Sequence, residues 1–169
     1  MTGWWRRNAV ALGVLVVVLP ATFVTVASQE SAQRGGASHD VFVALGESVK
    51  YAGATVGPAQ AEINDDPAAP RGTRVVAVTV EIDPDPTNPI ACLSPQLHEV
   101  GGLQRAWNER SVELNRGFDE DITSCSSEES LPYSLRLEYV VPEDATGPFT
   151  VDVNSVEGWP DLARLRVEP

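Results

Sequence analysis

TRVVAVTVEI, the segment from Thr73 to Ile82, carries an apolar residue at every second position through most of its length. A period of two places these residues on one face of an extended chain, which is typical of a β-strand with one buried face. SLRLEYVV, from Ser134 to Val141, has the same period. The residues on the two apolar faces are Val76, Val78, Val80 and Ile82, and Leu135, Leu137, Tyr139 and Val141. The sequence therefore predicts a strand in each segment.

Shorter segments repeat this alternation elsewhere in the chain. Phe149 to Val153 and Ala163 to Val167 alternate apolar and polar residues, and we predict a strand in each. Weaker candidates lie in Val41 to Leu45, in Glu47 to Tyr51 and within Ala54 to Ile63, each bounded by Gly or Pro. Predicted strands are thus spread over most of the chain beyond residue 40.

A double glycine predicts a hairpin in the middle of the chain. Gln96 to Val100 and Leu103 to Asn108 are separated by Gly101-Gly102, and glycine allows the positive φ that tight hairpin turns require. The alternative is a short helix, whose apolar face would consist of Leu103, Trp107 and Leu114. Such a helix would make no use of the two glycines, so we prefer the hairpin.

Seven to nine short strands with turn signals between them predict an all-β fold, an antiparallel β-sandwich. The Pro-rich segments Asp83 to Pro89 and Val141 to Pro148 suit its loops, where the missing N–H groups of proline are harmless. Trp159-Pro160 is expected to cover one rim of the core. Residues 41–169 are enough for one core of ordinary size and too few for two.

Ala9 to Ala27, AVALGVLVVVLPATFVTVA, contains nineteen residues and no charge. A helix rises about 1.5 Å per residue, so the segment would reach roughly 28 Å, close to the ~30 Å hydrocarbon thickness of a bilayer. We therefore expect a transmembrane helix at 9–27, in contact with the lipid bilayer. The alternative is the apolar region of a cleaved signal peptide, because a small-x-small site ends at Ala27.

The flanks of the apolar segment indicate the orientation of the chain. Arg6 and Arg7 precede it with no acidic residue nearby, and basic flanks stay in the cytoplasm. Trp4 and Trp5 suit the headgroup layer of the membrane. We therefore expect residues 1–8 in the cytoplasm, a flexible linker at 28–40 and an extracytoplasmic domain at 41–169, which would be secreted if the segment 9–27 is cleaved.

The part expected outside the membrane is strongly acidic. Beyond residue 27 the chain has twenty-four acidic and ten basic residues, a net charge of −14. This charge argues against nucleic acid as a partner, because binding it depends on neutralising phosphates with Lys and Arg. A solvated surface is the ordinary explanation of such a charge, and a docking face for a basic partner is the alternative.

Cys92 and Cys125 are the only cysteines, and both lie in the part expected to be exported. An oxidising compartment allows a single pairing, so we predict one structural disulfide. A redox-active pair is the alternative, but the sequence has neither a Cys-x-x-Cys motif nor a helix start that would lower the pKa of a thiol.

Residues suited to catalysis are sparse, and we assign no catalytic or cofactor-binding residue. The two histidines, His39 in the linker and His98 in a predicted exposed or edge strand, are too few for a His-rich metal site. Carboxylates in predicted loops are weak candidates for binding a hard cation such as calcium. These candidates are Asp83, Asp85, Asp119 and Asp121. The segment from Asp83 departs from the calcium-loop pattern, since Asn88 and Ser94 stand where Gly and Glu are needed.

Several segments together resemble a group of actinobacterial single-pass membrane proteins. They are Trp4-Trp5-Arg6-Arg7 with the following apolar run, GESVKYAGATVGPA (Gly46 to Ala59), GTRVVAVTVEID (Gly72 to Asp83), the two cysteines and YSLRLEYVVPEDATGPFTV (Tyr133 to Val151). The exported part is similar to immunoglobulin-like sandwich domains of unknown function in bacterial envelope proteins. The resemblance implies a fold and a location, and it brings no catalytic residue. The cysteine spacing is shorter than in antibody-type domains, where a buried Trp packs on the disulfide.

Three hypotheses about function follow. The first is a non-enzymatic, membrane-anchored protein of the cell envelope, whose sandwich domain binds another envelope protein or stabilises a membrane complex. The second is a small extracytoplasmic hydrolase or transferase that uses loop carboxylates. The third is a calcium-responsive sandwich domain. The first is preferred, because the sequence holds no recognisable catalytic constellation.

Overall fold

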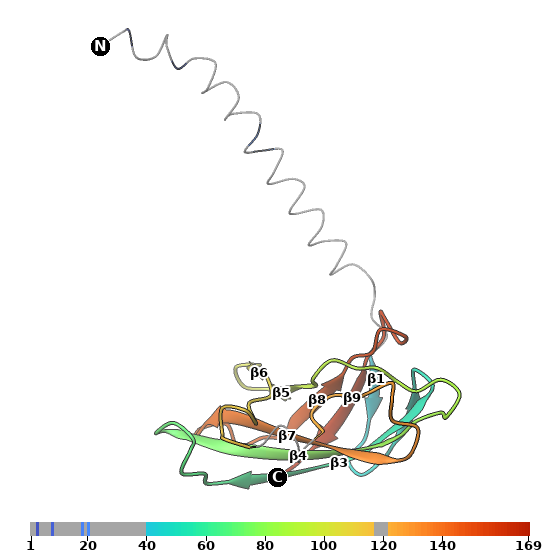
Figure 1. The fold of residues 1–169 in the computed structure, drawn as a ribbon. Helices are drawn as coiled ribbons and strands as arrows, with labels where there is room; N and C mark the ends of the chain where they lie inside the picture. The colour runs from blue at the N-terminus through green and yellow to red at the C-terminus, as the bar shows by residue number, and fades with distance from the viewer. Residues whose placement is uncertain (1–2, 4–7, 9–17, 19, 21–39, 117–121) are drawn as a thin grey trace. The chain divides into compact units, whose positions relative to one another are not determined.

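The computed structural model describes residues 40–116 and 122–169, together with Gly3, Asn8, Val18 and Pro20 (Figure 1). The rest of the apolar segment 9–27, its flank Trp4-Trp5-Arg6-Arg7 and residues 28–39 of the linker lie outside the described residues. Within the part that is described, no helix has the length and apolar character needed to cross a membrane. Residues Ser38–Pro169 form a compact unit, to which all of the following refers.

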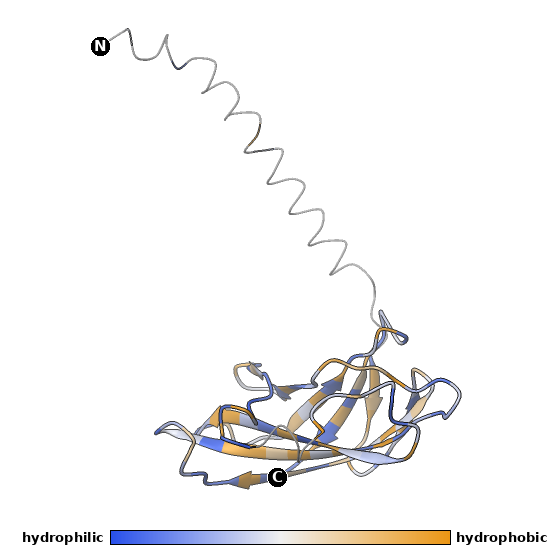
Figure 2. Ribbon diagram, viewed as in Figure 1, coloured by the Kyte–Doolittle hydropathy of each residue, from blue (hydrophilic) through white to orange (hydrophobic). Residues whose placement is uncertain are grey.

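Nine strands form two sheets in the described residues of this unit. The five-stranded sheet has the order β1 (Val41–Val43), β9 (Ala163–Val167), β8 (Phe149–Val153), β5 (Gln96–Glu99) and β6 (Ala106–Trp107). The four-stranded sheet has the order β2 (Val49–Tyr51), β3 (Ala54–Asn64), β4 (Thr73–Asp83) and β7 (Tyr133–Pro142). Apolar residues of both sheets belong to one core, so the fold is β-sandwich-like (Figures 1 and 2).

The all-β prediction is confirmed, and the predicted strands are found at the expected places. β4 and β7 pair along ten residues, from Thr73 opposite Pro142 to Ile82 opposite Tyr133. One pairing differs from the antiparallel expectation: β1 runs parallel to β9, with Val41 opposite Ala163. The strand pattern gives no information on direction, because alternation looks the same whichever way a strand runs.

The predicted hairpin is also confirmed, and the alternative helix is not found. β5 and β6 pair antiparallel, with Leu97 opposite Trp107. Gly101 and Gly102 both have positive φ angles, of 86° and 55°. The turn is longer than two residues, since it continues to Arg105, whose carbonyl accepts a 2.9 Å hydrogen bond from the Glu99 N–H.

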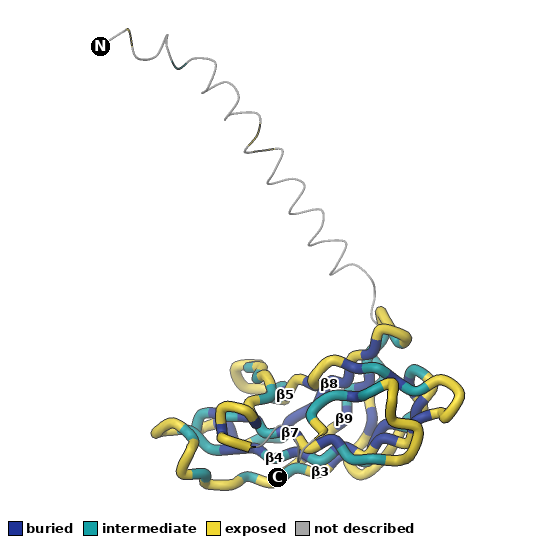
Figure 3. The backbone as a smooth tube through the Cα atoms, in the orientation of Figure 1, coloured by how far each residue is buried: buried dark blue, intermediate teal, exposed yellow. Residues whose placement is uncertain are grey.

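The core lies between the sheets and is formed largely by the apolar residues of the period-two pattern. Figure 3 shows buried backbone along the middle of the strands and exposed backbone in the connecting loops. The largest fully buried side chains are Tyr139, Phe149, Ile82, Ile90, Leu97, Leu135, Leu137 and Leu165. Burying side chains of this size is the main stabilising contribution to a fold of this kind.

Gly57 permits an irregularity in β3 that a larger residue would prevent. The register of β3 against β4 shifts between Val56 and Ala59. Gly57 has a φ of 97°, and a Cβ at this position would lie 2.7 Å from the Glu47 carbonyl oxygen. Only glycine combines this backbone angle with such a close approach.

The disulfide prediction is confirmed. Cys92 and Cys125 are joined, with 4.7 Å between their Cα atoms, and they are 33 positions apart in sequence. The bond links the β4–β5 connection to the segment that leads from β6 to β7. Both cysteines are buried, and the Cys125 N–H donates to the Cys92 Sγ at 3.0 Å.

Two described parts of the connection from β6 to β7, at Arg110 and at Ile122, contact the outer edge of β7. β7 is an edge strand of the four-stranded sheet. The Arg110 N–H donates to the Glu138 carbonyl at 2.8 Å, and the Arg136 N–H donates to the Ile122 carbonyl at 2.9 Å. The connection thus provides hydrogen-bond partners for two main-chain groups of β7 that have no partner within the sheet.

Because of Tyr139, we expect the free energy of unfolding to fall at alkaline pH. Its buried hydroxyl donates to the Pro95 carbonyl at 2.9 Å, and burial raises the pKa of Tyr139 far above its ordinary value. A raised folded-state pKa leaves stability complete below about pH 10, the unfolded-state value, and lowers it as pH rises further. We expect the Tyr139→Phe variant to lose most of this alkaline dependence and about 1 kcal/mol of unfolding free energy at neutral pH. A pH titration tests this when tyrosine ionisation is followed by phenolate absorbance and unfolding by circular dichroism. Ionisation of all three tyrosines without loss of structure would contradict the prediction.

Candidate functional site

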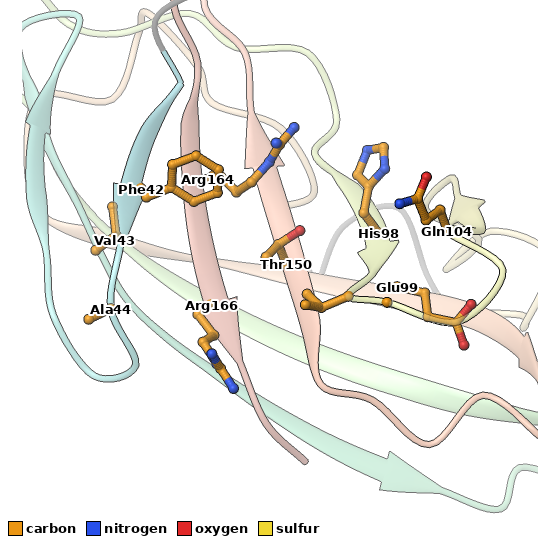
Figure 4. A pocket seen from close by; sticks show the side chains of 11 residues that line it. Phe42, Val43, Ala44, His98, Glu99, Gln104, Thr150, Arg164 and Arg166 are labelled. Carbon is orange, nitrogen blue, oxygen red and sulfur yellow. The ribbon is translucent and has the colours of Figure 1, made fainter.

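A groove on the outer face of the five-stranded sheet is the first candidate site. Its volume is about 730 Å³. It is bounded by β1 and β9 on one side and by the β5–β6 hairpin on the other, and Thr150 of β8 lies between them (Figure 4). The side chains that define it below are Phe42, His98, Gln104, Thr150, Arg164 and Arg166.

An ion-pair network holds the centre of the sheet beneath this groove. Arg164 donates to both carboxylate oxygens of Asp152, at 2.8 and 2.6 Å, and to Asp40 at 2.8 Å. The Asp152 side chain is only 5% exposed. These hydrogen bonds, above all those to Asp152, raise the pKa of Arg164. The network links β8, β9 and the residue before β1 into one unit.

His98 borders the same network. Its Nε2 lies 3.4 Å from the Asp152 Oδ2, and its side chain is 33% exposed. The expectation of an exposed or edge position is met only in part, because β6 covers the outer edge of β5. His98 therefore forms a polar part of the groove wall. No second histidine occurs among the described residues.

Phe42 forms the opposite wall. Its side chain is 72% exposed, although it belongs to a strand. The Arg164 guanidinium lies over the Phe42 ring, 5.4 Å from its centroid, which is within the range of a cation–π contact. The ring is therefore held in place on one side and open to solvent (Figure 4).

The hairpin wall is fixed by Arg105. This side chain bonds both oxygens of Glu99, at 3.0 and 2.9 Å, and lies over the Trp107 ring. It also bonds both oxygens of Asp144 at 3.0 Å. The guanidinium hydrogen bonds lower the pKa of Glu99 and of Asp144. The hairpin is thus tied to the β7–β8 loop.

A second candidate lies at the end of the sandwich where the chain enters the domain, which we name the tether end. It comprises residues 83–95, 126–132 and 154–162. Val41, at the start of β1, donates to the Leu162 carbonyl at 2.9 Å. The turn that joins β8 to β9 therefore lies beside the start of β1 (Figure 1).

Tyr51 holds the tether end together. Its hydroxyl donates to the Asp161 carbonyl at 2.7 Å and accepts from the Ser155 N–H at 3.0 Å. A Cβ at Gly158 would lie 2.5 Å from the Tyr51 ring, so glycine is required at this contact. Burial raises the pKa of Tyr51. Tyr51, and not Trp159, closes this rim of the core.

Four large apolar side chains are exposed at the tether end. They are Leu93, Leu131, Val156 and Trp159, and they are between 71% and 79% exposed. The prediction that Trp159 covers the core is therefore wrong. Leu93 donates its N–H to the Asn154 carbonyl at 3.2 Å, which brings two of the three loops together.

The three segments of the tether end also contain carboxylates. They are Asp83, Asp85, Glu128, Glu129, Glu157 and Asp161. The Asp85 carboxylate accepts from the Thr87 N–H and hydroxyl at 2.8 and 2.7 Å, and these bonds lower the pKa of Asp85. Of the weak metal candidates, Asp119 and Asp121 lie outside the described residues. Among the residues that are described, no group of three or more His, Cys, Asp or Glu side chains could hold a metal ion.

Sequence reasoning found neither surface. Asp152 and Arg164 stand at outward positions of their strands, and only the register of β8 against β9 makes them a pair. The signal that could have been used is an acidic and a basic residue in two neighbouring predicted strands. The tether end had no such signal, because an exposed Trp and a buried Trp look alike in sequence.

No protein-family model matches the chain, and no curated protein matches it. Among solved structures, the yjhA protein from Bacillus subtilis is similar. The sequence identity is 8%, the match covers 73% of this chain and 98% of that chain, and the TM-score is 0.49. This likeness assigns neither a fold family nor a function to the chain.

Proposed function

We propose that this protein is a non-enzymatic, membrane-anchored module of the bacterial cell envelope, whose extracytoplasmic, immunoglobulin-like domain binds another envelope protein through the tether end. The observation that carries the proposal is the exposure of Leu93, Leu131, Val156 and Trp159 at one end of the domain. Apolar side chains gathered on a surface and rimmed by polar groups are typical of a protein-binding site.

The negative charge of the tether end indicates which kind of surface the partner presents. The segments of the tether end contain six carboxylates, and the part of the chain beyond residue 27 has a net charge of −14. A complementary surface has an apolar centre and a rim of Lys and Arg. The same charge disfavours direct contact with anionic lipid. The partner is therefore a protein and not the membrane surface.

The length of the linker limits where that partner lies. Residues 28–40 form a chain of thirteen residues rich in Gly and Ser. A flexible chain of this length spans about 20 Å on average. With the apolar segment 9–27 retained as an anchor, a linker of this length reaches proteins that are held in the same membrane. We therefore place the partner among proteins of the same membrane.

A photo-crosslinking residue at position 159 of the full-length protein tests this proposal in native membranes. We expect Trp159→benzoyl-phenylalanine to form an adduct with an integral membrane protein, at a site flanked by Lys or Arg. The yield is expected to fall several-fold in high salt, because salt screens the charged rim, and in a Val156→Ser background.

Leu103 provides the matched control. It is 75% exposed and lies in the β5–β6 hairpin, at the opposite end of the domain. The same crosslinker at position 103 is expected to yield little of that adduct. Equal yields at both positions, or adducts with lipid alone at position 159, would contradict the proposal. Alkaline extraction of the membranes tests separately whether residues 9–27 remain as an anchor.

A further inference from the structure

The charged side chains that line the groove are all compensated by neighbours. Arg164 is paired with Asp152 and Asp40, and Arg166 with Glu168 at 2.7 Å. Glu99 is paired with Arg105 at 2.9 Å. A charged ligand would have to break one of these pairs or lose its own hydration without a counter-charge, and both are costly. The groove therefore suits a ligand without net charge.

The groove has both hydrogen-bond donors and hydrogen-bond acceptors. Gln104 offers an amide N–H₂ and a carbonyl oxygen, and Thr150 a hydroxyl that can donate and accept. His98 and Arg164 add ring and guanidinium N–H groups. Figure 4 shows Phe42, Arg164, His98 and Gln104 in a row above Thr150. An apolar ligand would displace water from the Gln104 amide and the Thr150 hydroxyl without replacing its hydrogen bonds, whereas a ligand with several hydroxyl groups matches them.

Phe42 adds an apolar platform at one end of this row. Its ring is 72% exposed and is already held by the Arg164 guanidinium at 5.4 Å. A side chain that is fixed before binding loses less conformational entropy when a ligand arrives. An aromatic face beside hydrogen-bonding groups is complementary to a sugar ring, which has C–H groups on its faces and hydroxyl groups around its rim.

The geometry points to a neutral oligosaccharide as the ligand of the groove, with Phe42 as its stacking platform and Gln104, His98 and Thr150 as hydrogen-bonding partners. The volume of about 730 Å³ is in the range of small-molecule sites. The groove is separate from the tether end, so this inference does not depend on the protein partner proposed above.

Calorimetric titration of the full-length protein, solubilised in a non-ionic detergent without sugar headgroups, tests the inference. The probes are the neutral trisaccharides chitotriose, cellotriose and maltotriose. We expect saturable binding of at least one of them. Phe42→Ala is expected to weaken that binding by a factor of about ten or more, the factor that corresponds to 1.4 kcal/mol of lost contact.

Two further variants make the outcome decisive. Trp159→Ala removes an aromatic residue that is 71% exposed but lies outside the groove, and we expect unchanged binding. Gln104→Asn shortens the amide while Asn still tolerates the φ of 52° at this position, and we expect several-fold weaker binding. Gln104→Asn also tests the groove if Phe42→Ala does not fold.

Three results would overturn the inference: no binding of any of the three trisaccharides, binding that survives both groove variants, or equal loss in Trp159→Ala. The same variants separate this inference from the proposed function. Crosslinking at the tether end should be insensitive to Phe42→Ala, and saccharide binding should be insensitive to Val156→Ser.

Discussion

Removing the disulfide through Cys92→Ala and Cys125→Ala is expected to lower the free energy of unfolding by about 3 to 4 kcal/mol. The bond closes a loop of 33 residues, and a loop of this length gains substantial chain entropy in the unfolded state when it is opened. Urea unfolding followed by circular dichroism measures the change as a lower midpoint. This is a large share of the 5–15 kcal/mol that typical domains possess.

Reduction of the wild-type protein provides the control for side-chain effects. Both cysteines are buried, so the alanine variant also loses sulfur contacts that the reduced protein retains. We expect the reduced protein to be destabilised slightly less than the alanine variant. A midpoint that does not move on reduction would contradict this prediction. Intact-mass analysis after alkylation should find no free thiol before reduction.

Replacing Arg164 by Met is expected to cost about 3 kcal/mol of unfolding free energy, because it leaves the Asp152 carboxylate buried without its main partner. The Asp152 side chain is 5% exposed, and only His98 remains near it, at 3.4 Å. The Met side chain preserves most of the aliphatic packing of Arg164. Urea unfolding of the two proteins under the same conditions measures the loss.

Arg166→Met is the matched control for this variant. Arg166 is on the same strand, two residues away, and its partner Glu168 is 47% exposed. Exposed pairs of this kind contribute less than about 1 kcal/mol. Adding Asp152→Asn to Arg164→Met should recover part of the lost stability, because the buried charge is then removed. Equal losses in Arg164→Met and Arg166→Met would mean that burial of Asp152 does not matter.

The strands were predictable because burial on one face leaves a period of two in the sequence. Thr73 to Ile82 and Ser134 to Val141 were placed to within one residue at each end. The disulfide was predicted from the presence of only two cysteines and from the expectation that both lie in an exported part of the chain. The parallel pairing of β1 with β9 was not predictable, because the alternation of Val41 to Val43 carries no direction.

The candidate sites could not be predicted from the sequence, for a different reason. Asp152 is a polar residue of the alternating segment Phe149 to Val153, yet it is buried beside Arg164. Burial on an outer face depends on which side chains lie across the neighbouring strand, and that depends on register. Trp159 was misplaced because Tyr51 already fills the rim that it was expected to cover.

The cover over β7 has a consequence for the protein at high local concentration. An open edge of ten residues would be a template for strand addition between copies, and copies at high concentration would meet such edges often. The covering segment is fastened at Cys125, so oxidation does more than stabilise the domain. Reduction of the disulfide is therefore expected to loosen the cover over β7 and to expose this edge to strand addition between copies.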